Sequence, residues 1–509
     1  MGLFEKGNYF PPENHQERID RYKENKKLVK GDHWEVFKGA NSTKNSKLYV
    51  SANLAGIIAK KSADFLIGDG VQVSAGREDN SSEQKALDRL MEDNDLDILF
   101  YESALSNAYR GDSFFRVRFG QKFNGAYPEF IDEKRVIIET VNAENVFPEV
   151  SAYNNNFIET YHVAVPQRVG EAKAVDAPNN YILNVETHRA GSITYSKYAM
   201  TCTMTDIYGS PVSYKIGDLI EEPVTVQTGV PLPLIVHVAN FSLDDTWEGL
   251  DDLTELKPLF DELNNRLSQV ASILDKHANP ALALPMGLMV EDSQGRPMFN
   301  VADSKVFELD DKDRMPQYIT WNGQLLECYS EIDRITDLIL MTAEIPAVAL
   351  GSGDSGTSGS SGLSIRFRLN SLISKIKRKR KYYEKGLKQI FYIAQLLEQA
   401  FRVDSYEVVK PKFIFTDGLD EDEVSKANMM AVRTGGAITM SQKRAIMLLD
   451  GLTEEQAEAE IQRIEEEQKS KAPAIASPSI FNDDYEDIYD EDEGTEETTE
   501  EDSEDAKDE

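Results

Sequence analysis

The chain has 509 residues, enough for two to four domains with sizeable cores, and its formal net charge is −34. Residues 481–509 contain 17 acidic residues and one Lys, which leaves a net charge of −18 for the other 480 residues. So acidic a chain is a poor nonspecific DNA binder, because phosphate neutralisation needs Lys and Arg. Two cysteines, Cys202 and Cys328, are too few for a disulfide framework.

The N-terminus lacks the apolar core of a signal peptide, and no apolar run approaches the roughly 18 residues that span a bilayer. We therefore expect a soluble protein that is made in the cytosol and has no membrane partner.

Residues 1–45 are polar and charged, with a short helix expected near 17–28, and we interpret them as an N-terminal arm outside the core. Apolar residues at helical spacing predict a helix over 49–66, which ends at a left-handed Gly68 cap. One or two further helices are predicted over 81–109. The period then falls to two, which predicts strands. The expected strands are 114–119, 136–141, 157–166, 181–185, 192–203 and a strand-rich stretch at 224–238. Residues 46–240 therefore have the pattern of an α+β domain.

Residues 243–277 predict a helix, with Thr246 or Asp245 as the N-cap. Pro258 predicts either a kink or the point where a first short helix gives way to a second. Strands are expected again at 288–290, 306–309 and 318–321, with a hairpin turn at 293–295. This module of about 40 residues is too small to bury a core alone, so we expect it to pack on a neighbour, for example another copy of itself.

Residues 324–402 predict a helix, a loop of small residues and a second, longer helix. The first helix is expected to stop at Pro346. Gly351–Gly362 contains only Gly, Ser, Thr and Asp, so it cannot build a core. A helix over 363–402 would be about 60 Å long. A strand at 408–415 and helices at 420–433, 441–449 and 454–467 follow, and no order is expected beyond Lys471.

The stretch Gly351-Ser-Gly-Asp-Ser-Gly356 matches the G-x-G-x-x-G dinucleotide pattern, which favours a nucleotide-binding enzyme as one alternative. That chemistry needs a strand before the glycines and a helix opening after them. Here a helix precedes them and more small residues follow. No metal or catalytic motif was found, so the sequence predicts no enzyme activity, no catalytic or metal-binding residue and no cofactor.

The strongest local charge feature is a basic run, with six Lys or Arg residues among residues 375–381. Lys375, Arg378, Lys379 and Lys381 are the candidate members of a basic helix face. Six charges on consecutive turns occupy most sides of a helix, so they cannot all face one ligand. We favour a solvated or inter-subunit face that neutralises acidic neighbours, and the alternative is contact with DNA phosphates.

The order of these parts resembles a tailed-bacteriophage portal protein, of the type found in phages with long, non-contractile tails. The resemblance covers about residues 15–470. It depends on five stretches: 50–68, Tyr109-Arg-Gly-Asp112, 256–264, the region from Thr342-Ala-Glu-Ile-Pro346 to Leu363-Ser-Ile-Arg366, and 435–441.

The resemblance implies an α+β portal fold, in which each part of the chain has an expected place. The parts are an arm (1–45), a wing (46–240), a first stem helix (241–279), a strand-rich clip (280–322), a second stem helix (323–345), a tunnel loop (346–362), a long wing helix with a strand (363–419), a helical crown (420–470) and a disordered acidic tail (471–509). The tunnel-loop candidates are Val348, Leu350, Gly351, Gly353, Asp354, Gly356, Gly359 and Gly362. The candidate channel-facing acids are Glu327, Asp333 and Asp337.

The resemblance also implies a function. Copies of the chain, usually twelve, would form a ring at one capsid vertex of the virion, assembled in the host cytoplasm. The ring would pass double-stranded DNA during packaging, retention and ejection. Its implied partners are the terminase large subunit, head-completion or adaptor proteins, and the major capsid and scaffolding proteins. A helical scaffolding protein is a further alternative, which the predicted strands disfavour.

Overall fold

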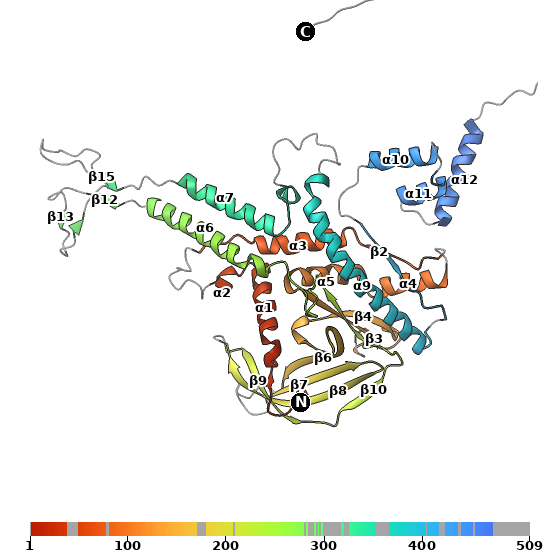
Figure 1. Ribbon diagram of the computed structural model, residues 1–509, viewed down its shortest axis with the longest axis horizontal. Helices are drawn as coiled ribbons and strands as arrows, with labels where there is room; N and C mark the ends of the chain where they lie inside the picture. Colours follow the sequence, from red (N-terminus) through yellow and green to blue (C-terminus); the bar gives the residue numbers. More distant parts are fainter. Residues whose placement is uncertain are drawn as a thin grey trace, which may run out of the picture. The chain divides into compact units, whose positions relative to one another are not determined.

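The computed structural model divides into two compact units, residues 1–426 and 427–509, which are described separately. Figure 1 shows the arrangement of the elements within the first unit. The structure describes residues 2–37, 49–77, 81–123, 125–169, 180–206, 209–278, 281–283, 290–291, 294, 297–298, 317–319, 325–351, 366–403, 405–416, 423–435, 439–450 and 454–471. Within those ranges, every helix is too short or too polar to cross a bilayer.

The N-terminal residues belong to the core and do not form a separate arm, contrary to the sequence prediction. They form β1 (Tyr9–Phe10), α1 (Glu13–Lys30) and α2 (His33–Phe37). Phe10, Ile19 and Tyr22 of this stretch are buried. The buried Arg18 donates hydrogen bonds to the carbonyl oxygens of Ala143 and Val146, at 3.2 and 2.8 Å. Partners of this kind make burial of a polar side chain tolerable, which is why a polar sequence can pack here.

The first unit contains a three-stranded antiparallel sheet with the order β11–β3–β4. These strands are β3 (Asp112–Gly120), β4 (Arg135–Val141) and β11 (Ile235–Ala239). Successive side chains of β3 point to opposite faces. Phe115 belongs to the main apolar core on the helical side, whereas Phe114 packs with Tyr161 on the other side.

Helices cover the first of these faces (Figure 1). They are α3 (Leu54–Ile67), α4 (Ser82–Asp93), α5 (Leu96–Arg110) and α9 (Asn370–Ala400). The predicted helices of 49–66 and 81–109 are therefore confirmed, although Gly68 has φ 63° and ψ −137° and is not in the left-handed helical region. Gly386 lets α9 approach β11 closely, because an added Cβ would lie 2.5 Å from Val238.

The other face is covered by a seven-stranded antiparallel sheet with the order β1–β9–β8–β7–β6–β5, in which β10 also pairs with β8. Its remaining strands are β5 (Val146–Ser151), β6 (Asn154–Arg168), β7 (Tyr181–Arg189), β8 (Ser192–Thr205), β9 (Pro211–Leu219) and β10 (Val224–Gln227). The sequence predicted none of the strands β1, β5 and β9 of this sheet. The small helix η2 (Ala143–Asn145) precedes β5.

The predicted helix of 243–277 is shorter in the structure. Residues 243–253 are not helical, and a 3₁₀ turn η3 (Thr254–Leu256) leads into α6 (Lys257–Ala278). Thr246 and Asp245 are therefore not N-caps. Pro258 lies in the first turn of α6, where proline is accommodated because the missing N–H would have no helical partner. This matches the second of the two alternatives for Pro258.

α6 and α7 (Leu325–Thr342) lie side by side in the first unit (Figure 1). Between them along the chain, β12 (Ala281–Ala283) pairs with β15 (Gln317–Ile319), and β13 (Val290–Glu291) pairs with β14 (Pro297–Met298). Gln294 lies in a turn between β13 and β14, and the other residues of the predicted turn at 293–295 lie outside the described residues. The predicted strand at 306–309 lies outside the described residues.

After α7 comes the 3₁₀ turn η4 (Ala347–Leu350), and α9 ends before β16 (Lys412–Phe415), which pairs with β2 (Val71–Ser74). α9 is shorter than predicted: its 31 residues correspond to about 47 Å. The second unit holds α11 (Gln442–Asp450) and α12 (Glu454–Lys471), with most of α10 (Glu423–Gly435). Lys443 of α11 pairs with Glu458 of α12 at 3.2 Å.

Candidate functional site

The candidate site is the junction where α7 ends, the Gly/Ser loop begins and α9 packs against both. The Ile345 N–H donates to the Leu340 carbonyl at 2.9 Å and the Glu344 N–H to the Met341 carbonyl at 3.1 Å. These two bonds form a Schellman end, with Glu344 at φ 57° in the left-handed position that usually holds Gly. The helix therefore stops at Thr342 by its own cap, before the predicted stop at Pro346.

The first residues of the predicted tunnel loop form η4. Val348 and Leu350 are half-buried, and Leu350 packs against the main core. Gly351 follows in the left-handed conformation, with φ 74°. The remaining candidates, Gly353, Asp354, Gly356, Gly359 and Gly362, lie outside the described residues.

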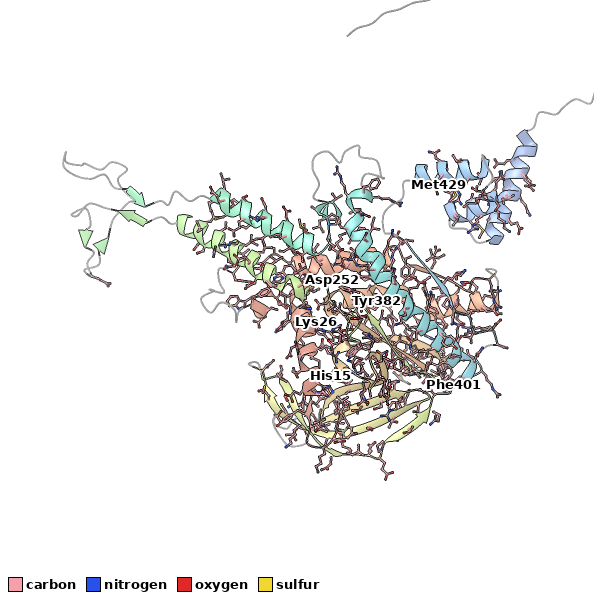
Figure 2. All side chains as sticks on the ribbon, in the orientation of Figure 1. His15, Lys26, Asp252, Tyr382, Phe401 and Met429 are labelled. Carbon is pink, nitrogen blue, oxygen red and sulfur yellow. The ribbon has the colours of Figure 1, made fainter. Side chains whose placement is uncertain are left out.

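A buried charge cluster fixes the start of α9 to the end of α7. Its centre is Asp252, in the segment before α6, labelled in Figure 2. The Asp252 carboxylate pairs with the ammonium groups of Lys375, at 3.4 Å, and Lys379. It also accepts hydrogen bonds from Ser62 Oγ of α3, at 2.8 Å, and from Asn240 Nδ2, at 3.2 Å.

The cluster also contacts two residues between α7 and the loop. Lys375 Nζ donates to the Ala343 carbonyl oxygen at 2.9 Å, and Arg378 pairs with Glu344. Both contacts hold residues that directly follow α7, so the position of α9 is linked to the position of the segment that leads into the loop.

Two ammonium groups share one carboxylate in this cluster. Burial disfavours the charged Asp252, but Lys375 and then Lys379 outweigh burial and hold the pKa of this carboxyl well below its usual range. Burial also lowers the pKa of Lys379 to about 8, although Asp252 acts in the opposite direction. The cluster is therefore an electrostatic contact whose strength depends on the Lys379 proton.

The basic run divides between the inside and the outside of the chain. Lys375 and Lys379 are buried against Asp252, so their charges face the chain's own interior and not DNA or a neighbouring subunit. Arg378 and Lys381 are exposed. The sequence did not indicate Asp252 because its two lysine partners lie more than 100 positions further along the chain. The one available signal was an acidic pair, Asp251 and Asp252, inside a leucine-rich stretch.

The three candidate acids lie on one side of α7. Glu327, Asp333 and Asp337 are exposed. The helical positions of Asp333 and Asp337 are opposite those of the buried Ile335 and Ile339, whereas Glu327 lies at the edge of this exposed side. Across the helix pair, Arg266 of α6 contacts Glu331 at 3.1 Å. The exposed Arg334 lies on the same side of α7, so one basic group stands among these acids. Among the residues with described positions, no group of three His, Cys, Asp or Glu could hold a metal ion.

Comparison with known proteins decides the family. The family model described as "Phage portal protein, SPP1 Gp6-like" matches residues 11–474. The chain belongs to this portal family. The resemblance inferred from the sequence is thereby confirmed, and the mixed helices and sheets confirm the α+β class.

Solved structures similar to this portal chain include a chain in the neck of a native GTA particle, computed with C12 symmetry, and one in the neck of an empty GTA particle, computed with C6 symmetry. Each is 12% identical to this chain and covers 82% of it and 93% of its own length, with TM-scores of 0.43 and 0.44. Among curated proteins, no sequence match is found.

The portal family consists of structural proteins. The family match therefore favours neither the nucleotide-binding enzyme nor the helical scaffolding protein that the sequence left as alternatives. A helix and a 3₁₀ turn, not a strand, precede the Gly351 motif, so the start of a dinucleotide-binding unit is missing. The seven-stranded and three-stranded sheets of the first unit are likewise unsuited to a purely helical scaffolding protein.

Proposed function

We propose that copies of this portal protein, twelve as the resemblance implies, close into a ring at one capsid vertex of the virion. Double-stranded DNA passes through the ring during packaging, is retained by it, and leaves through it at ejection. The observation that carries this proposal is the family match, which spans 464 of the 509 residues.

The α6–α7 pair supports the ring, because α7 has apolar side chains that are exposed in the described part of the chain. Leu326 and Met341 are 82% and 73% exposed. Within the described residues, the pairs β12–β15 and β13–β14 have two strands each, and isolated two-stranded hairpins are marginally stable. Neighbouring copies related by a closed rotation can cover both features through one heterologous interface.

The acidic face of α7 supports the DNA channel. In the ring, Glu327, Asp333 and Asp337 face the bore and repel phosphates, which B-DNA carries at about one per 1.7 Å. DNA then slides and is not held in one register. The loop at 346–362 projects toward the DNA from its anchor on Ala343 and Glu344. Arg378 and Lys381 serve contacts between subunits.

The remaining partners follow from this placement. The clip at 280–322 docks the terminase large subunit during packaging and later receives the head-completion or adaptor proteins. The wing, 46–240 with α9, meets the major capsid and scaffolding proteins. Assembly takes place in the host cytoplasm, and the protein requires no cofactor and catalyses no reaction.

Electron microscopy of the purified full chain tests the ring and its bore. We expect closed rings with an axial hole and rotational symmetry. A monomer at micromolar concentration, or a ring without an axial hole, contradicts the proposal.

A further inference from the structure

The loop between β3 and β4, residues 121–134, presents a cluster of large apolar side chains to solvent. Phe123, Tyr127, Phe130 and Ile131 are between 49% and 81% exposed, and Phe130 is the most exposed of them. Single exposed apolar residues are ordinary on a protein surface, but a cluster of them marks an interaction site.

This aromatic loop is held in shape before any partner binds. The Asp132 carboxylate is buried and accepts hydrogen bonds from the backbone N–H groups of Lys122, at 2.9 Å, and Phe123, at 2.8 Å. The Arg118 guanidinium donates to the carbonyl oxygens of Gln121 and Lys122, at 3.0 and 3.2 Å. Binding through a preorganised loop loses little conformational entropy, so the loop is well suited to act as an anchor.

The same chain contains a cavity of matching chemistry. It has a volume of about 370 Å³ and lies among β6, β11, the segment 242–247 and α9, where Tyr382 is labelled in Figure 2. Its volume is in the range of about 300–1,000 Å³ that is typical of ligand pockets. Its aromatic lining consists of Phe157, Tyr161, Trp247 and Tyr382. Such walls favour an aromatic guest through edge-to-face and offset contacts.

The charged groups beside the cavity also indicate what kind of side chains would bind there. Lys385 and Gln389 also line the cavity and are exposed. Across the described ranges Lys385 has no ion-pair partner, whereas the neighbouring Lys388 pairs with Glu384 at 2.6 Å. The aromatic loop carries Glu133, which is exposed and also lacks an ion-pair partner in the described structure. The loop therefore supplies both an aromatic group and a carboxylate, as the cavity requires.

We propose that Phe130 of one copy inserts into the Trp247–Tyr382 cavity of the next copy, with Glu133 beside Lys385. This proposal rests on the ring described above and names one contact that builds it. A second copy is the favoured occupant because the anchor and the cavity are different surfaces of one chain. Such a contact is heterologous, and repetition of a heterologous contact generates a closed ring when the rotation closes.

Disulfide trapping tests the direction of the contact. The full chain with Cys202→Ala and Cys328→Ala receives Phe130→Cys and Gln389→Cys together. Mild oxidation should give a ladder of covalent dimers, trimers and larger species on non-reducing gels. A mixture of the two single-cysteine proteins should give dimers and no longer species, because each chain then has only one half of the contact. The pair Met204→Cys and Gln389→Cys is the matched control, since Met204 is 61% exposed on β8, and it should give no ladder.

The possible failures are distinguishable. Closed rings in the microscope without a ladder overturn this contact and leave the proposed function intact. Absence of rings in the unmodified chain overturns both.

A second variant measures what the anchor contributes. Phe130→Asp should raise the protein concentration at which half of the chains are assembled by about tenfold or more, as for a buried aromatic hot spot. Met204→Asp should leave it within about twofold. Equal effects of the two variants contradict the proposal. Normal ring assembly by Phe130→Asp with loss of incorporation into capsids assigns the loop to another protein and also contradicts it.

Discussion

At the residue scale, the cluster around Asp252 holds together parts that are distant in the sequence. Ser62 of α3, Lys375 and Lys379 of α9 and the segment before α6 all meet at one carboxylate. A buried ion pair contributes little net stability when intact, but removal of one partner leaves an uncompensated charge and costs about 3–5 kcal/mol. The cluster thus specifies where α9 lies more than it stabilises the fold.

The lowered pKa of Lys379 predicts a pH dependence. In the unfolded chain this lysine titrates near its ordinary value of about 10.4, whereas burial lowers its pKa to about 8 in the folded chain. Between pH 8 and 10 the unfolded chain therefore binds more protons, so this residue makes the free energy of unfolding rise with pH. Lys379→Met abolishes that contribution. The stability of the variant relative to the unmodified chain should thus fall by on the order of 2 kcal/mol from pH 7 to pH 10.

Urea unfolding at several pH values measures this difference. Lys381→Met is the matched control, because Lys381 is exposed on the same helix and the substitution leaves the contacts of Asp252 intact. A relative stability of Lys379→Met that is constant across this range would refute a buried, proton-sensitive lysine.

At the element scale, the sequence predicted well those elements whose apolar spacing is regular. α3, α4, α5 and α7 were found because their buried positions recur every three or four residues. α1 was located but judged to be outside the core, because Arg18 and its other polar residues find buried partners only in the folded chain. Residues 243–253 contain leucines at helical spacing, yet the Gly249 carbonyl oxygen would lie 2.2 Å from a Cβ at Gly111, a close approach that no local pattern reveals.

The same limit applied to the candidate site. The helix–loop–helix could be located from the sequence, since two amphipathic periods flank a tract of small residues. The contacts that hold the loop in place could not be located from the sequence. Which lysines of the basic run turn inward depends on Asp252, at a sequence separation of 123 to 127 residues, and the left-handed Glu344 replaces the Gly that would have signalled a helix end.

The anchors of the loop predict the result of a deletion. Removal of residues 351–362 leaves the contacts of Lys375 with Ala343 and of Arg378 with Glu344, so ring assembly should be unchanged by electron microscopy. DNA packaging or retention should be impaired, because the segment proposed to touch the moving DNA is gone. The measurement is the nuclease-protected DNA per particle. Deletion of residues 171–178, between β6 and β7, is the control. Normal packaging by the variant that lacks residues 351–362 would refute the role of the loop.

At the scale of the whole molecule, the charge of the chain opposes its own assembly. Each copy carries a net charge of −34, of which −16 belongs to residues 481–509. A ring brings many such charges close together, and salt screens their repulsion at separations beyond a Debye length, which is about 10 Å at 0.1 M. The same salt weakens the contact of Glu133 with Lys385, but this contact involves one pair of charges per interface. The repulsion between copies therefore determines whether salt strengthens or weakens ring assembly.

Ring assembly should therefore strengthen as salt rises from low to physiological concentration. The protein concentration at half-assembly, measured by sedimentation or single-particle mass, should fall over this range for the full chain. A chain that ends at Lys471 lacks nearly half of the net charge, so its half-assembly concentration should depend less on salt. Replacement of the acidic residues in 481–509 by Asn and Gln keeps the length of the segment and should match the truncation. If the three proteins share one salt dependence, the acidic segment does not oppose assembly, and the repulsion must come from the −18 of the remaining chain.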